Sequence, residues 1–343
     1  MPTIRDYGQV AYIHGTSGTP VSIEGFDVWD IDLDVEQVDA YANRIDTNTG
    51  LIRAPFSGSA YNKVGFSTYI QGQESSAVPT NIGALLRSAC AAESSAGSSY
   101  VAVSYTWAAL HTSAFVPLAS SGLFDAIDIH VVRGGDAATT GETIIADSVM
   151  ATELDFVFVP GDRAYLRYAG RGTVDTSGTT ATTSGATTAT RSARASGLPD
   201  PVNPHNLAFT ITPSGTSAFS PVLKSITWQV RITAAPRTDL NNTHGYTDPR
   251  PTMIALSAVI KIETPLLATY NAITQAKSMT QQALSMTYNN SGGDGQEMTF
   301  SMDSLIDPSS ISQSTEDGLN VTEFTANADV AGNGLLISTT TAG

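Results

Sequence analysis

Apolar and polar residues alternate with a period of two in many segments of the chain. Between residues 226 and 232, Ile226, Trp228, Val230 and Ile232 alternate with polar residues, which puts the apolar side chains on one face of a β-strand. The same alternation predicts strands at residues 28–36, 124–132, 226–232 and 254–262, with shorter ones at 66–71, 100–106, 154–159, 164–169, 207–212, 298–302, 321–325 and 335–338. Turn residues separate most of these segments, so the fold is predicted to be mainly β.

Two segments have apolar residues at helical spacing instead. The first, residues 81–92, follows a proline and has a suitable N-cap in Thr80 or Asn81. The second, residues 264–279, carries Pro265 at a position suited to the first helical turn. The residues on one helical face are Ile82, Leu85, Leu86 and Ala89 in the first segment, and Leu266, Tyr270, Ile273 and Lys277 in the second.

A low-complexity segment divides the chain. Of the 25 residues in Thr173–Gly197, 13 are Ser or Thr, and no large apolar residue follows Val174, so this segment cannot contribute much to a core. A Pro-rich connector, Leu198–Pro204, leads back to strands. The predicted organisation is a first part of the core at residues 1–172, an exposed loop or arm at 173–204, and a second part of the core at 205–343.

The chain is poor in charge and acidic. Charged residues make up 14% of its 343 residues, against roughly 25% in ordinary soluble domains. The 32 acidic residues outnumber the 17 basic ones, which gives a net charge of −15. A protein that grips nucleic acid needs a surplus of Lys and Arg, so tight DNA binding is not expected. Two readings stay open: a surface that is acidic for solubility, or one that lies near DNA without holding it.

Motifs for catalysis and metal binding are not found. The run Asp30, Asp32, Asp34 resembles the start of a calcium loop, but Val35 and Tyr41 stand where that loop needs Gly and Glu. No histidine has a partner at metal-ligand spacing, and neither a nucleophile elbow nor a phosphate loop occurs. The scattered histidines are His14, His111, His130, His205 and His244. The chain is therefore predicted to be no enzyme and to bind no cofactor.

Two further features bear on the compartment. Cys90 is the only cysteine, so no intrachain disulfide can form, and its apolar helical setting favours a small buried residue over a nucleophile. The N-terminal residues lack a hydrophobic signal region, and no stretch approaches the ~18 apolar residues of a membrane span. We expect assembly in a reducing cytoplasm.

The predicted strand at residues 28–36 has an acidic face. The apolar face would consist of Trp29, Ile31, Leu33 and Val35, and the acidic face of Asp30, Asp32, Asp34 and Glu36. Same-face carboxylates about 7 Å apart repel one another, so this face needs water or basic partners. The strand is a solvated outer strand, a wall of a water-filled lumen that repels DNA phosphates, or an interface with arginines of another subunit.

The segment that runs from Phe66 to Gln73 and then from Val78 to Cys90 resembles the tail tube proteins of siphophages, the phages with long non-contractile tails. These proteins carry a strand that ends in a Gly-containing turn and is followed by a helix with a Pro-x-x-x-Gly-x-Leu-Leu-Arg pattern. The matching positions are Gly72, Pro79, Gly83, Leu85, Leu86, Arg87 and Cys90. Later segments, among them 164–172, 223–230, 242–251 and 316–337, are similar in order, so the resemblance covers most of the chain.

The resemblance implies an antiparallel β-sandwich with a flanking α-helix, which contributes strands to a β-barrel lumen built by six subunits. It implies hexameric rings stacked into the tube that conducts viral DNA. Implied partners are further copies of the chain, the tape measure protein, the tail terminator, the tail tip proteins and, transiently, DNA. The implied location is the virion tail, and no catalytic residues are implied.

Other protein classes remain as alternatives. Another virion part, such as a tail terminator, a decoration protein or a fibre domain, is the first of them. A secreted adhesin should show an export signal, which the sequence lacks. A carbohydrate-active enzyme needs a pair of carboxylates, and nothing in the sequence selects one pair.

Overall fold

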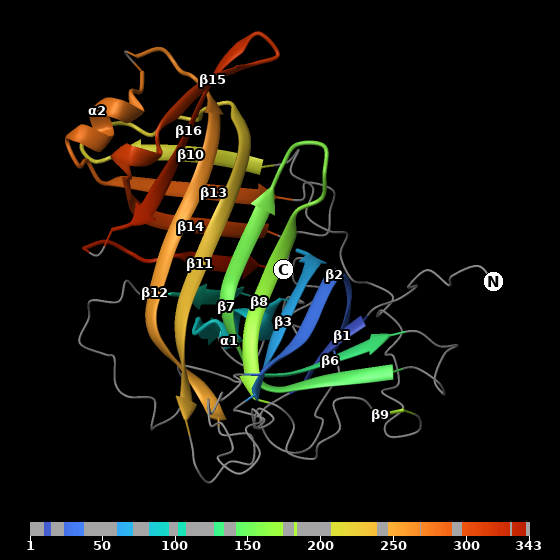
Figure 1. Ribbon diagram of the computed structural model, residues 1–343. Helices are drawn as coiled ribbons and strands as arrows, with labels where there is room; N and C mark the ends of the chain where they lie inside the picture. The colour runs from blue at the N-terminus through green and yellow to red at the C-terminus, as the bar shows by residue number, and fades with distance from the viewer. Residues whose placement is uncertain are drawn as a thin grey trace, which may run out of the picture.

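The computed structural model describes residues 10–14, 24–37, 60–70, 82–95, 102–107, 127–133, 142–173, 182–183, 207–238, 246–267, 269–289, 297–329 and 331–340. These residues are mainly β-structure, as the alternation predicts (Figure 1). The strands are β1 (Val10–His14), β2 (Glu24–Gln37), β3 (Ala60–Tyr69), β4 (Ala92–Ser95), β5 (Ala102–Thr106), β6 (Ile127–Arg133), β7 (Glu142–Phe158), β8 (Tyr165–Thr173), β9 (Thr182–Thr183), β10 (Leu207–Pro213), β11 (Leu223–Thr238), β12 (Tyr246–Glu263), β13 (Gln282–Asn289), β14 (Glu297–Ile306), β15 (Ser312–Glu316), β16 (Leu319–Ala328) and β17 (Leu336–Thr340). The helices are α1 (Gly83–Ser88), α2 (Ala272–Lys277) and the short 3-10 turn η2 (Pro308–Ser310).

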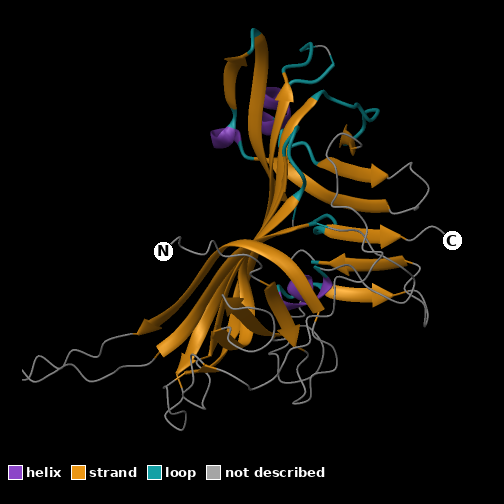
Figure 2. Cartoon of the chain, turned by 90° about the vertical axis from the view of Figure 1, so that its right-hand side faces the viewer, coloured by secondary structure: helices purple, strands orange, loops and turns teal. Residues whose placement is uncertain are grey.

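Fourteen of the described strands join in one large antiparallel sheet that is not closed into a barrel. The sheet folds into two layers. The front layer has the spatial order β2, β3, β8, β7, β11, β12, β16, with β15 paired to β16. The back layer has the order β10, β13, β14, β17, β5, β4. The strands of the two layers run across one another (Figure 1, Figure 2).

A smaller sheet is attached through two strands that belong to both sheets. The first half of β2 pairs with β1, and the first half of β7 pairs with β6, which also pairs with β1. The second halves of β2 and β7 continue into the front layer. Asp30 in β2 and Ser148 in β7 have positive φ angles of 53° and 49° and lie at breaks in register. These bulges bend each strand from one sheet into the other.

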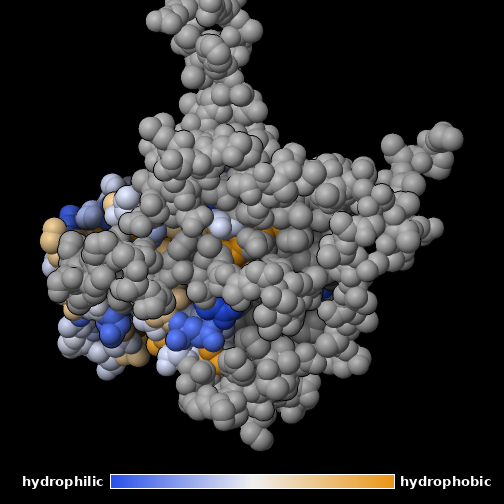
Figure 3. Space-filling model, turned by 90° about the horizontal axis from the view of Figure 1, so that it is seen from below, coloured by the Kyte–Doolittle hydropathy of each residue, from blue (hydrophilic) through white to orange (hydrophobic). Residues whose placement is uncertain are grey.

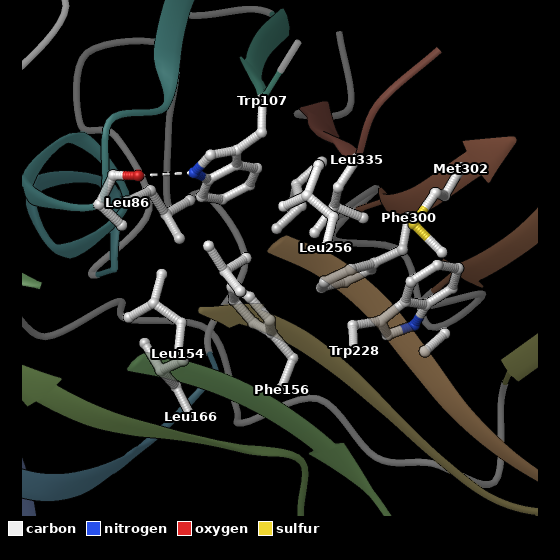
Figure 4. Packing of buried hydrophobic residues seen from close by; sticks show 14 of the residues in the cluster. Leu86, Trp107, Leu154, Phe156, Leu166, Trp228, Leu256, Phe300, Met302 and Leu335 are labelled. Carbon is white, nitrogen blue, oxygen red and sulfur yellow. Dashed lines mark hydrogen bonds between the residues drawn. The ribbon is translucent and has the colours of Figure 1, made fainter. Parts of the chain in front are cut away.

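The two layers meet over an aromatic cluster centred on Phe300 of β14 (Figure 4). Its ring lies 5.4 Å from the rings of Phe156 and Phe158 in an edge-to-face arrangement, and 5.9 Å from the indole of Trp228, onto which it stacks. All four side chains are at least 98% buried. Because these rings come from β7, β11 and β14, the cluster fixes the front layer against the back layer.

Helix α1 confirms the first predicted helix but is shorter than residues 81–92. The predicted apolar face is fully buried, whereas Ala92 already belongs to β4. The N-cap is Ile82, which makes no side-chain capping hydrogen bond, so the prediction of Thr80 or Asn81 as N-cap is wrong. The helix ends in a left-handed residue, Cys90 (φ 65°), and the Ala91 amide donates to the Leu86 carbonyl, which gives a Schellman motif.

The second predicted helix is largely wrong. Only Ala272–Lys277 is helical, and its N-cap is Asn271, whose side chain accepts a hydrogen bond from the Thr274 amide at 3.2 Å. Residues 264–267 lie before the helix and are not helical. Tyr270 is buried and stacks on Phe219, whereas Leu266 is 80% exposed, so the residues expected on one face do not share an environment.

The predicted strands that fall in the described ranges are confirmed, although β7 begins at Glu142 instead of 154 and β12 at Tyr246 instead of 254. Strands β1, β4, β9, β13 and β15 were not predicted. β13 has a clear alternation, since Leu284, Met286 and Tyr288 are buried, while every residue of β15 is exposed. The exposed loop or arm predicted at residues 173–204 lies outside the described residues except for Thr173 and the short β9.

Two glycines in neighbouring strands provide a matched test of packing. At Gly170 in β8, an added β-carbon would lie 2.7 Å from Val149 Cγ1 and 2.9 Å from the Met150 carbonyl oxygen. At Gly65 in β3, the nearest atom would be Asp32 Cβ at 3.5 Å, an ordinary contact. We expect Gly170→Ala to lower the free energy of unfolding by about 1–3 kcal/mol in urea titrations. Gly65→Ala should leave it nearly unchanged, and equal losses would contradict this packing.

Candidate functional site

The outer face of the front layer carries a row of polar residues that crosses six neighbouring strands. Backbone pairing aligns one polar residue on each strand from β3 to β16. This polar row consists of Ser67, Arg167, Asp155, Gln229, Ser257 and Asn327. Among the elements that the structure describes, none lies over this face (Figure 1).

On each of the six strands, one residue directly before or after the polar-row residue points to the other face. These six residues form a second aligned row, the core row. They are Thr68, Leu166, Phe156, Trp228, Ala258 and Ala326, and each is at most 1% exposed. One face of the front layer is therefore mostly apolar and buried. The other face carries the polar row, in which Arg167 and Asn327 are exposed, Gln229 and Ser257 are half-buried, and Ser67 and Asp155 are buried. Since a slip of one residue would exchange the two faces, burial of the core row holds the polar row outside.

Arg231 forms ion pairs with two carboxylates in the middle of the polar face. Its guanidinium lies 2.6 Å from Asp155 Oδ1 and 3.0 Å from Glu153 Oε1. The pKa of Glu153 is raised, mainly by burial and further by nearby Asp155, while the positive charge of Arg231 lowers it in part. The side chain of Asp155 is only 10% exposed, so its charge depends on Arg231. This part of the face is therefore polar without a strong local surplus of negative charge.

Aromatic rings and arginines gather at the β2 end of the same face. The ring of Trp29 lies 4.5 Å from the ring of Tyr69 and 6.0 Å from that of Tyr165. Arg163 lies over Tyr69 at 5.8 Å, and Arg167 lies over Tyr165 at 5.4 Å. Such cation–π contacts restrict the motion of the rings and leave the cations at the surface.

The acidic strand predicted at residues 28–36 lies in β2, but its alternation is interrupted. In the pairing with β3, Trp29 lies opposite Ser67 and Asp32 lies opposite Gly65. The two residues between them, Asp30 and Ile31, therefore face a single residue of β3, as in a β-bulge. Trp29 contacts the outer aromatic rings, whereas Ile31 packs against the core, so these two residues do not share a face as predicted. Asp30 and Asp32 are exposed.

The register also gives the acidic strand basic neighbours. Asp34 pairs with Lys63 of β3, and Lys63 pairs with Arg171 of β8. Glu36 pairs with Tyr61. The side chains of Asp34 and Glu36 lie outside the described residues, but their backbone places two cations on the strands beside them. No local sequence pattern indicates these neighbours, because Lys63 and Arg171 are far from β2 along the chain.

One edge of the front layer is open at β2. In the described part of the chain, Val28–Gln37 pairs with β3 on one side and with no strand on the other. The bulge at Asp30 and the carboxylates that follow it are features by which soluble proteins keep an edge from pairing at random. The edge nevertheless offers free backbone groups to a specific partner strand.

The helix residues of the resemblance have structural roles. Gly83, Leu85 and Leu86 are buried in α1, which contacts β5, β6 and β7. Arg87 forms an ion pair with Glu93 in β4. Gly72 and Pro79 lie outside the described residues. These side chains fasten the helix to the core, and none of them lies on the polar face.

The part of the chain that the structure describes shows no metal-binding cluster. There, three or more His, Cys, Asp or Glu residues do not come together in a way that could hold a metal ion. The described helices are all too short or too polar to cross a membrane. The known protein families and the curated proteins with which the sequence was compared give no match.

The ion pairs of Arg231 and Lys224, both on β11, differ in burial and should differ in strength. Arg231→Ala leaves the buried Asp155 carboxylate without its cation, and we expect a loss of about 1–3 kcal/mol in unfolding free energy, since Arg231 is itself partly exposed. Lys224→Ala breaks a pair with Glu263 that is about a third exposed on both sides, and we expect a loss below about 1 kcal/mol. Chemical denaturation measures both, and similar losses would contradict the role given to Arg231.

Cys90 should react slowly while the chain is folded. Burial raises the pKa of its thiol to about 12, so the reactive thiolate is scarce at pH 8. We expect modification by an aromatic disulfide reagent to be at least about a hundredfold slower in buffer than in urea. Free cysteine in the same urea concentration controls for the reagent, and equal rates for the folded and unfolded chain would show that the thiol is accessible.

Proposed function

We propose that the chain is the structural subunit of a phage tail tube: hexameric rings of it stack into the pipe through which viral DNA enters the host. The observation that supports this best is the front layer, a broad sheet with a polar face and with an edge at β2 that pairs with no further strand among the described residues. The sequence resemblance to siphophage tail tube proteins points to the same role. In this reading the two layers are the β-sandwich of that family, and α1 is its flanking helix.

The open edges explain how subunits would join. The front layer ends in β2 on one side and in β15 on the other, and every residue of β15 is exposed. When the β2 edge of one copy pairs with the opposite edge of the next, each sheet continues into its neighbour. Head-to-tail contacts of this kind close into a ring, and the joined sheets then form a barrel that no subunit forms alone.

The polar face would line the lumen of such a barrel. Exposed Asp30 and Asp32 and the overall charge of −15 keep phosphates away from the wall over roughly the 8–10 Å screening length of physiological salt. Arg231 balances Glu153 and Asp155, so the wall has no deep minimum of either sign at its centre. DNA would pass through such a lumen without being held.

The remaining parts of the proposal follow from the family role. The tape measure protein would fill the tube before DNA passes, and the terminator and tip proteins would close its ends. The tube would be assembled in the host cytoplasm and carried in the virion. A second candidate function is another virion part, such as a terminator, decoration protein or fibre domain, because an open sheet edge also suits those assemblies.

Electron microscopy of the purified chain tests the function directly. We expect open-ended tubes of uniform width in negative stain, because each ring presents the same surface to the next. Closed single rings without tubes would favour a terminator. A monomer at every concentration would contradict both.

Two neighbouring proline variants test the β2 edge. Successive N–H groups of a strand point to opposite sides within the sheet, so of Leu33 and Asp34 one directs its N–H to β3 and the other to the open edge. Proline at the first kind of position breaks a ladder bond and should lower the melting temperature. Proline at the second kind should leave the melting temperature unchanged and prevent tube formation. If tubes form normally from the variant with unchanged stability, β2 is not the edge that joins subunits.

A further inference from the structure

Most exposed large apolar side chains of the described residues lie at one end of the molecule. Leu266 and Leu267 are 80% and 70% exposed in the segment before α2, and Met279 is 77% exposed after it. We call this surface the α2 cap. Its members are Val222, Leu266, Leu267, Ile273, Met279 and Leu319.

Hydrogen bonds and a groove connect the members of the α2 cap. The Glu263 amide donates to the Val222 carbonyl at 2.9 Å, and the Thr264 amide donates to the Asn320 carbonyl, next to Leu319, at 2.8 Å. A groove lined by Leu267 and Ile273 on one side continues to β15 and β16 on the other. The cap is therefore one surface and not a set of scattered side chains.

The α2 segment of the cap, residues 264–282, is also nearly free of charge, whereas Leu319 follows Glu316 and Asp317. From Thr264 to Gln282 the only ionisable residue apart from Tyr270 is Lys277, in a chain with a net charge of −15. Two copies of an acidic chain repel each other over most of their surfaces. They can approach most closely where carboxylates are missing, so the cap suits contact with a second copy.

The α2 cap lies apart from the β2 edge, and its groove borders β15 at the other edge of the front layer. The cap lies where β11 begins and β12 ends, at one end of the front-layer strands, whereas β2 is a lateral edge of that layer (Figure 1). At the opposite end of these strands, the described residues seen from below include a group of strongly hydrophilic side chains (Figure 3). A partner on the cap would therefore extend the assembly along the strands.

We propose that the α2 cap is the stacking contact on which a copy of the chain from the next ring docks. This inference rests on the proposed tube, and it adds which surface holds one ring to another. A stable interface takes about 800 Å² from each partner and has an apolar core inside a polar rim. The exposed apolar residues of the cap would supply this core, and the polar residues around α2 would supply the rim.

The double variant Leu266→Glu/Leu267→Glu tests the stacking contact. Both side chains are exposed, so the subunit should keep its circular dichroism spectrum and melting temperature. We expect at least a tenfold loss of material that sediments as tubes, with single rings remaining in electron micrographs. The matched control is Met253→Glu on β12, where an exposed apolar residue far from the cap is replaced by the same charge; it should form tubes like the unchanged chain.

The outcomes distinguish the two proposals. If the double variant forms normal tubes, the cap is not the stacking contact, while the tube function stands. If the unchanged chain forms no tubes but self-associates, and the double variant abolishes that association, the cap binds a second copy and the tube function fails. If the unchanged chain binds lipid vesicles through the cap and stays monomeric, the cap is a membrane surface and the inference is overturned.

Discussion

Backbone pairing holds six strands of the front layer in one register, and the remaining features of the molecule depend on that alignment. It brings Trp228 and Phe156 to the same depth under Phe300 of the back layer, and it sets Arg231 beside Asp155 on the opposite face. Burial of the core row and placement of the polar row on the opposite face are two results of one constraint. Contacts on one face of the layer therefore also determine where the side chains of the other face lie.

The sequence predicts the strands well and the helices less well, for a physical reason. A half-buried strand such as residues 226–232 shows its face directly, because burial alternates with every residue. Around α2, Leu266, Tyr270 and Ile273 have helical spacing, but Tyr270 leaves that pattern to stack on Phe219. A tertiary contact there overrides a local preference. The same applies to α1, which a left-handed Cys90 ends before Ala92.

The candidate site could be predicted only in part. The carboxylates of β2 are visible in the sequence, and Asp30 and Asp32 are exposed. The bulge at Asp30 and the cross-strand neighbours Lys63 and Arg171 depend on pairings between distant segments, which no local pattern contains. The open edge is a property of what β2 does not pair with in the described chain. The open edge can be recognised only when the order of all described strands is known.

Strand β7 has a mechanical consequence. Its 17 residues extend about 55 Å at the usual rise per residue, and they hydrogen-bond first in the smaller sheet and then in the front layer. Tension applied along this strand is shared by ladders on both sides of the bend, so many hydrogen bonds must shear together before it yields. The bulge at Ser148 lets the two sheets tilt without breaking those ladders. The subunit is thereby both hard to pull apart and able to flex.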